Sequence, residues 1–260
     1  MTDVAAHLFD THCHLAAPEL YVQRERILAE ARAAGVAQIL TVACQPEEFE
    51  LAINLVQDAG LYLATGIHPH EAAKAEEPHW AALASTWRQP KVVAAGEMGL
   101  DYHYDFSPRD VQRRVFERQL DLAGQASLPV IIHCREAQAD VIAILADHGF
   151  DGRAVVFHCF SGTAEEAAEI RAHGWWTSFT GVITFKNAAA QRQACLETPA
   201  DQLMFETDSP YLSPEPVRRM RPNEPKNLVY TIRFAADLRG DQFEALAARS
   251  TANARRFFRL

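Results

Sequence analysis

The 260-residue sequence lacks long apolar runs and has only five cysteines. A membrane-spanning helix needs about 20 predominantly apolar residues, and the apolar runs here are much shorter. The N-terminus has no basic segment followed by an apolar core, so we expect no signal peptide. The cysteine spacing does not suggest a disulfide framework. Together these absences favour a cytoplasmic, reduced protein.

The chain also lacks an excess of positive charge, because its formal net charge is −9. This charge argues against a protein that coats nucleic acid through a broad basic surface. It does not exclude an enzyme that meets phosphates in one local site. Metal ions bound there would supply positive charge that a count of side chains omits.

Short apolar segments rich in β-branched residues recur along the chain, separated by helix-length connections. Near-continuous apolar strands are typical of a parallel sheet that is buried on both faces. We expect eight strands, over His7–His14, Val36–Ala43, Leu61–His68, Lys91–Glu97, Val130–Cys134, Ala154–Cys159, Trp175–Thr180 and Leu203–Asp208.

Two architectures can hold eight parallel strands with intervening helices. A doubly wound open sheet is one, but the first turn after a strand here carries no Gly-x-Gly-x-x-Gly. The other is a (β/α)8 TIM barrel, which gathers its functional residues at the C-terminal ends of many strands. The distribution of histidines and carboxylates favours the barrel. We therefore predict an α/β protein with one TIM-barrel domain over residues 1–260.

The connections carry recognisable helix signals. We expect a single helix from Pro18 to Ala34. Ser107 and Pro108 predict a helix that begins with a serine cap and a proline in the first turn. Thr163 and Glu166 predict a capping box at the start of another helix.

The first predicted strand ends in His12-Cys13-His14. Side chains alternate along a strand, so the two histidines share one face and Cys13 occupies the other. Two imidazoles on one face can hold a divalent cation. The same pattern also arises by chance at a protein surface, so the rest of the chain must decide between the two interpretations.

Most of the other predicted strands also end in side chains that can bind a metal ion. These are His68 and His70 after the third strand, Glu97, His133 and His158 at the fourth to sixth, and Asp208 at the eighth. In a TIM barrel they would meet where active sites lie. Histidine and carboxylate ligands suit Zn²⁺, Mn²⁺, Co²⁺ or Mg²⁺. Alternation turns Cys134 and Cys159 to the opposite face, so we expect the cysteines to serve in packing.

These residues offer more ligands than one ion with an open position needs. We therefore expect two divalent ions about 3.5–4 Å apart, bridged by Glu97. The first ion is assigned His12, His14 and Asp208, and the second His133 and His158. Asp208 would adjoin the first strand in a closed barrel. It is also the expected general base, which takes a proton from water activated by the ions.

Some neighbouring residues leave two interpretations open. Asp10 either orients a ligand imidazole or belongs to a buried polar layer. Arg135 either clamps a substrate phosphate or forms a surface ion pair. His68 and His70 either bind substrate or contact the metal ligands and hold them in position.

A basic loop follows Asp208. It contains Arg218, Arg219, Arg221, Asn223 and Lys226. Beside a metal centre such a loop predicts a track for a phosphate backbone, although a solvated surface loop has the same composition. Within this segment we expect Arg221 to contact substrate and Tyr211 to stack on a terminal base.

At these residues the sequence resembles the TatD family of metal-dependent deoxyribonucleases, within the amidohydrolase-like superfamily of barrels. The resemblance covers essentially the whole chain. It rests on ordered motifs that include Asp10-Thr11-His12-Cys13-His14-Leu15, Gly66-Ile67-His68-Pro69-His70, Gly96-Glu97-Met98-Gly99-Leu100-Asp101, Ile132-His133-Cys134-Arg135, Phe157-His158-Cys159-Phe160 and Glu206-Thr207-Asp208-Ser209-Pro210-Tyr211. Ala16 departs from the acidic residue that many relatives carry there, but it touches no assigned ligand.

The resemblance implies a two-metal TIM barrel with ligands at His12, His14, Glu97, His133, His158 and Asp208. It also implies hydrolysis of DNA phosphodiesters by a 3′ to 5′ exonuclease that depends on Mg²⁺ or a similar ion. Single-stranded DNA or 3′ ends are the expected substrate, and no protein partner is indicated. One rival is a metallohydrolase of an ester, lactone or amide, such as an aminoacyl-tRNA deacylase. A non-catalytic, metal-dependent binding protein is the other.

Overall fold

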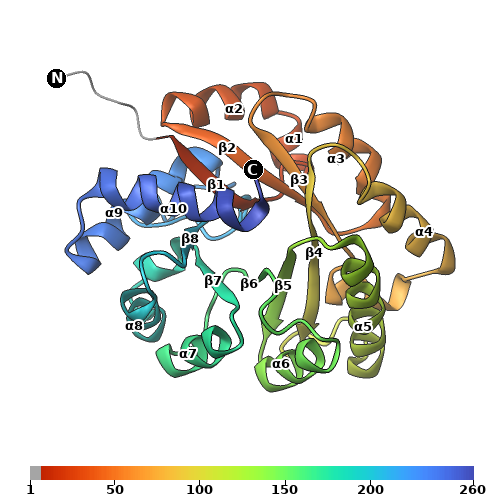
Figure 1. Ribbon diagram of the computed structural model, residues 1–260. Helices are drawn as coiled ribbons and strands as arrows, with labels where there is room; N and C mark the ends of the chain where they lie inside the picture. The colour runs from red at the N-terminus through yellow and green to blue at the C-terminus, as the bar shows by residue number, and fades with distance from the viewer. Residues whose placement is uncertain (1–6) are drawn as a thin grey trace. The chain divides into compact units, whose positions relative to one another are not determined.

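The computed structural model describes residues 7–260. Its eight strands form one sheet in chain order. They are β1 (Leu8–Cys13), β2 (Val36–Ala43), β3 (Leu61–Thr65), β4 (Val92–Asp101), β5 (Val130–Arg135), β6 (Val155–Phe157), β7 (Trp176–Phe179) and β8 (Leu203–Phe205) (Figure 1). A parallel bridge between Cys13 and Ser209 makes the first and last strands neighbours as well. This topology confirms the predicted (β/α)8 TIM barrel.

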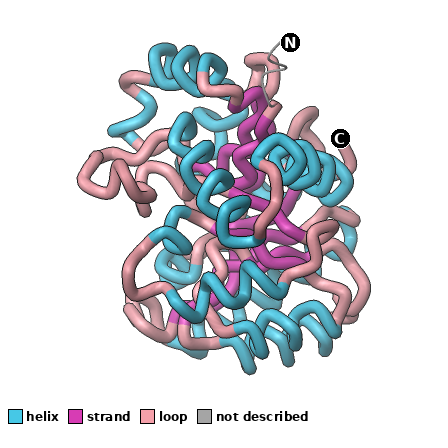
Figure 2. The backbone as a smooth tube through the Cα atoms, turned by 90° about the vertical axis from the view of Figure 1, so that its left-hand side faces the viewer, coloured by secondary structure: helices cyan, strands magenta, loops and turns pink. Residues whose placement is uncertain are grey.

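The connections between strands are mostly helical, as Figure 2 shows in cyan. The α-helices are α1 (Pro18–Tyr21), α2 (Arg24–Ala33), α3 (Phe49–Leu55), α4 (Glu77–Thr86), α5 (Arg109–Ala126), α6 (Gln138–Asp147), α7 (Ala164–Ala172), α8 (Ala189–Glu197), α9 (Leu228–Arg239) and α10 (Phe243–Phe258). In the described part of the chain, the 3₁₀ helices are η1 (Pro46–Glu48), η2 (Pro69–Lys74), η3 (Gly181–Thr184) and η4 (Pro225–Asn227). Within residues 7–260, no helix has both the length and the apolarity that crossing a bilayer requires.

The contacts among Cα atoms group the chain into two compact units. The first unit contains residues 7–41, 159–168 and 177–260, and so holds β1, most of β2, β8 and the helices α1, α2 and α8 to α10. The second contains residues 42–158 and 169–176, with β3 to β6 and α3 to α6. Organisation as a single domain stays a prediction.

Two helix predictions were wrong and one is confirmed. The segment from Pro18 to Ala34 is two helices, whose buried residues keep a helical spacing across the break and so look continuous in sequence. Ser107 does not cap α5, because its hydroxyl donates to the His70 carbonyl and accepts from the N–H of Ala73. The capping box is confirmed, because Thr163 and Glu166 exchange hydrogen bonds.

Helix α5 shows how the second unit fixes the ends of its strands. Its buried face carries apolar residues at helical spacing together with Gln112 and Gln119. The Gln112 amide accepts from the N–H of Asp101 and donates to its carbonyl. Gln119 makes the same pair of hydrogen bonds with Ile67. Since an unpaired buried polar group is costly, these two side chains hold the backbone where β3 and β4 end.

Candidate metal centre

In the first unit, His12, His14 and Asp208 lie together. The Nε2 atoms of the two histidines are 3.3 Å apart at the end of β1. The Asp208 Oδ1 atom is 3.4 Å from Nε2 of His14 and 3.9 Å from Nε2 of His12. His12 is fully buried, whereas the other two side chains are partly exposed. The structure thus brings together the three residues that the sequence assigned to one ion.

A hydrogen-bonded turn after β8 presents Asp208. Its N–H donates to the His12 carbonyl at 2.9 Å, and its φ of 52° lies in the left-handed region that aspartate tolerates better than most residues. The Asn223 amide donates to the carbonyls of Thr207 and Tyr211, on either side of Asp208. The predicted strand from Leu203 to Asp208 is therefore too long, since β8 ends at Phe205 and Asp208 lies in a turn.

Asp10 holds the backbone beneath this cluster. Its carboxylate accepts from the N–H and hydroxyl of Thr207, at 2.9 and 2.6 Å, and from the N–H of His12 at 3.4 Å. Burial raises the pKa of Asp10 to about 8, against the hydrogen bonds from Thr207, and the charge of Glu206 adds to the rise. Asp10 contacts the peptide of His12, not its ring. This geometry favours the buried polar layer over an imidazole-orienting role.

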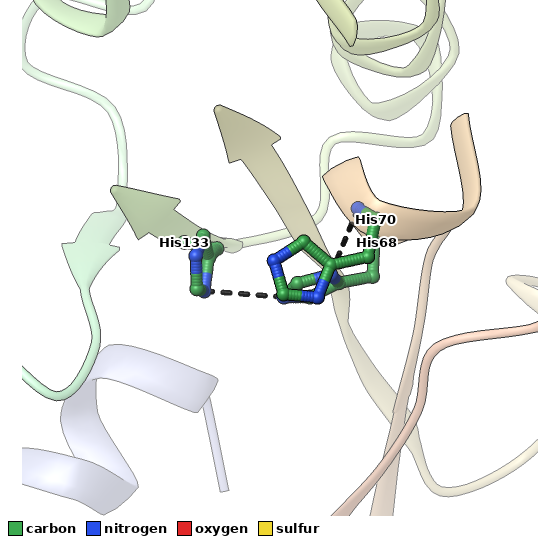
Figure 3. A group of neighbouring side chains, drawn as sticks. All are labelled: His68, His70 and His133. Carbon is green, nitrogen blue, oxygen red and sulfur yellow. Dashed lines mark hydrogen bonds between the residues drawn. The ribbon is translucent and has the colours of Figure 1, made fainter. Parts of the chain in front are cut away.

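In the second unit, three imidazoles surround the buried carboxylate of Glu97. Its Oε1 atom is 2.7 Å from Nε2 of His158, 2.8 Å from Nδ1 of His133 and 3.4 Å from Nε2 of His68. The His68 Nε2 atom is also 3.2 Å from the His133 Nδ1 atom (Figure 3). Glu97, His133 and His158, which the sequence placed around the second ion, therefore lie together.

Two glycines allow the backbone to approach closely around Glu97. A Cβ atom on Gly66 would lie 2.6 Å from the Glu97 carbonyl oxygen. Gly99 has a φ of 143°, and a Cβ there would lie 2.0 Å from the carbonyl oxygen of His133. Both distances are far below van der Waals contact, so only glycine fits. Gly66 thus lets the backbone after β3 approach Glu97, and Gly99 lets β4 approach the backbone of His133.

Asp101 is a neighbour of the candidate ligands that sequence reasoning missed. Its Oδ2 atom accepts from Nε2 of His133 and Nε2 of His70, each at 2.9 Å, and its Oδ1 atom accepts from the N–H groups of His103 and Tyr104. Burial opposes ionisation, but these hydrogen bonds hold the pKa of Asp101 well below its usual range. Its position four residues after Glu97 on β4, with the same parity, was the available signal.

The hydrogen-bond partners of His68 determine which of its ring nitrogens carries the hydrogen. Its Nδ1 atom accepts from the N–H of His70 at 3.1 Å, so the neutral ring carries its hydrogen on Nε2 (Figure 3). Burial and the charge of His133 lower the pKa of His68 to about 4. His68 is therefore a neutral donor, whose Nε2 atom lies 3.2 Å from Nδ1 of His133 and 3.4 Å from Oε1 of Glu97. Of the two roles predicted for it, the geometry favours support of the cluster.

The donor atoms of both clusters fit metal ions. Two nitrogens, each about 2.0–2.1 Å from a tetrahedral Zn²⁺ ion, lie roughly 3.4 Å apart, close to the 3.3 Å between His12 and His14. In the second unit, Asp101 accepts a hydrogen bond from the Nε2–H of His133. In the neutral ring, the Nδ1 lone pair then faces the Glu97 carboxylate at 2.8 Å. Only a proton or a cation between them makes that contact favourable.

Cys44 is a second residue that sequence reasoning missed. It follows β2, one of the two strands for which the sequence offered no ligand. Its Sγ atom lies 3.5 Å from Oε2 of Glu97. Burial raises the pKa of the Cys44 thiol well above its usual value, and the charges of Glu97 and Glu48 add to the rise. The neutral thiol therefore donates to the carboxylate.

The predicted substrate-binding residues differ in exposure and in the groups that they contact. Tyr211 is exposed, and its ring centroid is 6.0 Å from that of His14. The guanidinium of Arg135 lies over the ring of Tyr104, 4.6 Å from its centroid, and its role as a phosphate clamp stays a prediction. Arg221 donates to the hydroxyl of Ser213 and to two carbonyls of its own loop, so its side chain holds the loop together.

Comparison with known proteins identifies the family. Residues 9–259 match the model of the family described as TatD related DNase. The chain belongs to the TatD family. It is 40% identical to the uncharacterised metal-dependent hydrolase YabD of Bacillus subtilis, over 97% of this chain and 99% of that protein. It is also 36% identical to the 3′-5′ ssDNA/RNA exonuclease TatD of Erwinia tasmaniensis, over 97% of this chain and all of that protein.

A solved TatD-family structure supports the same assignment. The TatD homologue YJJV of Escherichia coli K12 superposes with a TM-score of 0.93 at 29% identity, covering 99% of this chain and all of that one. The resemblance seen in the sequence motifs is therefore confirmed. As a TatD-family member, the protein is a metal-dependent hydrolase that acts on ester bonds.

Proposed function

We propose that this TatD-family hydrolase is a nuclease that removes nucleotides from the 3′ end of DNA with the help of two divalent ions. The observation that carries the proposal is the pair of donor clusters. His12, His14 and Asp208 form one in the first unit, and Glu97, His133 and His158 form the other in the second. The relative named 3′-5′ ssDNA/RNA exonuclease supports single-stranded nucleic acid as the substrate class.

Each cluster supplies ligands for one ion, which is Mg²⁺, Mn²⁺, Co²⁺ or Zn²⁺ by the chemistry of its histidines and carboxylates. When bound, such ions lower the pKa of water and neutralise charge that develops on a phosphate. That Glu97 bridges the two ions stays a prediction from the sequence.

The protein's own residues hold and move protons in this scheme. Asp208 is partly exposed and accepts the proton of the attacking water. Asp101 keeps the hydrogen of His133 on Nε2 and so leaves Nδ1 available as a ligand. The neutral His68 presents its Nε2–H to both His133 and Glu97 and so supports the position of these two groups.

Cleavage of end-labelled single-stranded DNA tests the proposal. Protein is stripped with a chelator and reloaded separately with Mg²⁺, Mn²⁺, Co²⁺ or Zn²⁺. A 5′-labelled strand should shorten in a ladder, while a 3′-labelled strand should release labelled mononucleotide at once. Asp208→Asn should lose at least 100-fold in rate, by the magnitude of general-base catalysis of about 10²–10⁴. The exposed Asp201→Asn is the matched control.

Three outcomes would contradict the proposal. Turnover of carboxylic esters, lactones or aminoacyl-tRNA without any cleavage of DNA would assign a different ester substrate. A labelled 5′ end released first would reverse the polarity. Full activity in Asp208→Asn would remove that residue from the chemistry.

A further inference from the structure

The loop after β4 exposes two aromatic rings beside the histidine cluster of the second unit. Tyr104 is 47% exposed and Phe106 is 66% exposed. The two rings are stacked, with centroids 5.2 Å apart and an interplanar angle of 8°. Apolar rings in water are unfavourable unless a ligand or partner covers them. A stacked pair also offers a flat face that a third ring can extend.

The pair is held in place by the residues that support the metal cluster. The His70 ring meets Phe106 edge-on, with centroids 4.8 Å apart and planes at 79°. It meets Tyr104 in the same way at 5.6 Å. The N–H of Tyr104 donates to Asp101, whose other oxygen accepts from His70 and His133. A ring pair fixed in this way loses little conformational entropy when a ligand binds.

The charges around the pair favour a ligand that combines a flat ring with a phosphate. The guanidinium of Arg135 lies over Tyr104, two residues after His133 on β5. The acidic side chains of these loops are paired, Asp105 with Arg109 at 3.0 Å and Glu136 with His103 at 2.7 Å. A nucleotide supplies both a ring to stack and an anion for the guanidinium.

We propose that Tyr104 and Phe106 form a stacking platform for the terminal base of a nucleic acid strand, with Arg135 facing its phosphate. The proposal rests on the proposed nuclease function and deepens it by naming the substrate contact. Every base has a π face, so the platform gives affinity without sequence preference. It assigns base stacking to this loop, whereas the sequence suggested Tyr211.

A binding assay with 2-aminopurine tests the platform. Metal-free protein is titrated into a single-stranded oligonucleotide that carries 2-aminopurine at its 3′ end, because stacking quenches this base. Affinity is also measured for the same oligonucleotide with an abasic 3′ residue. The base should be quenched, and its removal should weaken binding by about 5- to 150-fold, the range for one base on an aromatic side chain.

Substitutions of Phe106 test whether its ring is the one on which the base stacks. Phe106→Ala should abolish the quenching and make the base and abasic strands bind equally, whereas Phe106→Trp should keep both effects. Phe106 is largely exposed, so its truncation should lower thermal stability only slightly, through the lost contacts with Tyr104 and His70. Tyr230→Ala, an exposed aromatic residue on α9, is the matched control.

The possible outcomes separate the two proposals. Quenching that depends on Phe106 in a protein that cleaves no DNA would support the platform and refute the nuclease. DNA cleavage with no quenching, or with equal binding of base and abasic strands by the wild type, would overturn the platform alone. Quenching that survives Phe106→Ala but is lost in Tyr211→Ala would also overturn it. Failure of the wild type to bind either strand would refute the platform as well.

Discussion

The Nε2 atom of His133 donates to the Oδ2 atom of Asp101 at 2.9 Å, and the Nδ1 atom of the same ring lies 2.8 Å from Oε1 of Glu97. A carboxylate behind a ligand imidazole fixes its tautomer and increases its basicity. The same oxygen of Asp101 accepts from His70, and its other oxygen holds the backbone of the Tyr104 loop. Asp101 therefore joins the candidate metal ligands to the exposed aromatic pair.

Asp101→Ala should weaken metal binding by about 10- to 100-fold, because His133 loses the partner that orients it. Competition with a chromophoric chelator measures the affinity. The surface pair of Asp121 and His148, at 2.9 Å, provides the control, and Asp121→Ala should bind metal like the wild type. Equal affinities in the two variants would show that Asp101 does not act through His133.

Cys44→Ala should weaken metal binding by about 2- to 10-fold, the net value of one ordinary hydrogen bond. Cys44→Ser keeps a donor toward Glu97 and should recover most of the loss. The same chelator competition applies. An equal loss in both variants would point to a direct role of sulfur as a ligand, and no loss in either would exclude Cys44 from the site.

Removing metal with a chelator should lower the thermal unfolding temperature, because ions that bind only the folded state stabilise it. His14→Ala should show a smaller difference between loaded and stripped protein. The partly exposed His173, which pairs with Asp151, gives the control variant His173→Ala, which should keep the full difference. An unchanged difference in His14→Ala would remove His14 from the ligands.

Glu224→Gln should destabilise the protein in a pH-dependent way. Burial would raise the pKa of Glu224, but the hydrogen bonds from Arg26 and Lys226 hold it below the ordinary 4.5. A depressed pKa contributes stability above the unfolded value and loses it as pH falls through the folded value. At pH 7 the cost should be about 1–2 kcal/mol, since Arg26 is itself exposed.

Urea unfolding at pH 7 and at successive values below 4.5 measures this effect, with Glu117→Gln as a control. The difference between wild type and Glu224→Gln should shrink as the pH falls. A difference that stays constant with pH would show that the carboxylate charge is not what holds α2 to η4.

The barrel topology was predictable because its strands are short apolar runs between strong helix signals. His12, Glu97, His133 and His158 stood out because each ends or follows such a run, and parallel strands carry their functional residues at one end. Strand parity placed His12 and His14 on one face correctly, although the pairing of β1 and of β4 with their neighbours is irregular there. The grouping of His12 with His14, and of Glu97 with His133, followed from parity and strand order.

The supporting interactions were not predictable in the same way. The position of Asp101 four residues after Glu97 was a local signal, but its partners His70 and His133 come from different elements and no local pattern reveals them. The contact of Arg135 with Tyr104 depends on the path of the loop after β4. Similarly, Ser107 carried a helix-capping signal but binds the backbone of η2. In each case a contact between distant segments decides the role of the side chain.

The most direct test of the account is the location of the metal ions in zinc-loaded crystals by anomalous diffraction. The account predicts two peaks per chain. One should lie about 2.0–2.1 Å from Nε2 of His12 and Nε2 of His14, and the other at the same distance from Nδ1 of His133. A single peak, or peaks that contact neither cluster, would contradict it.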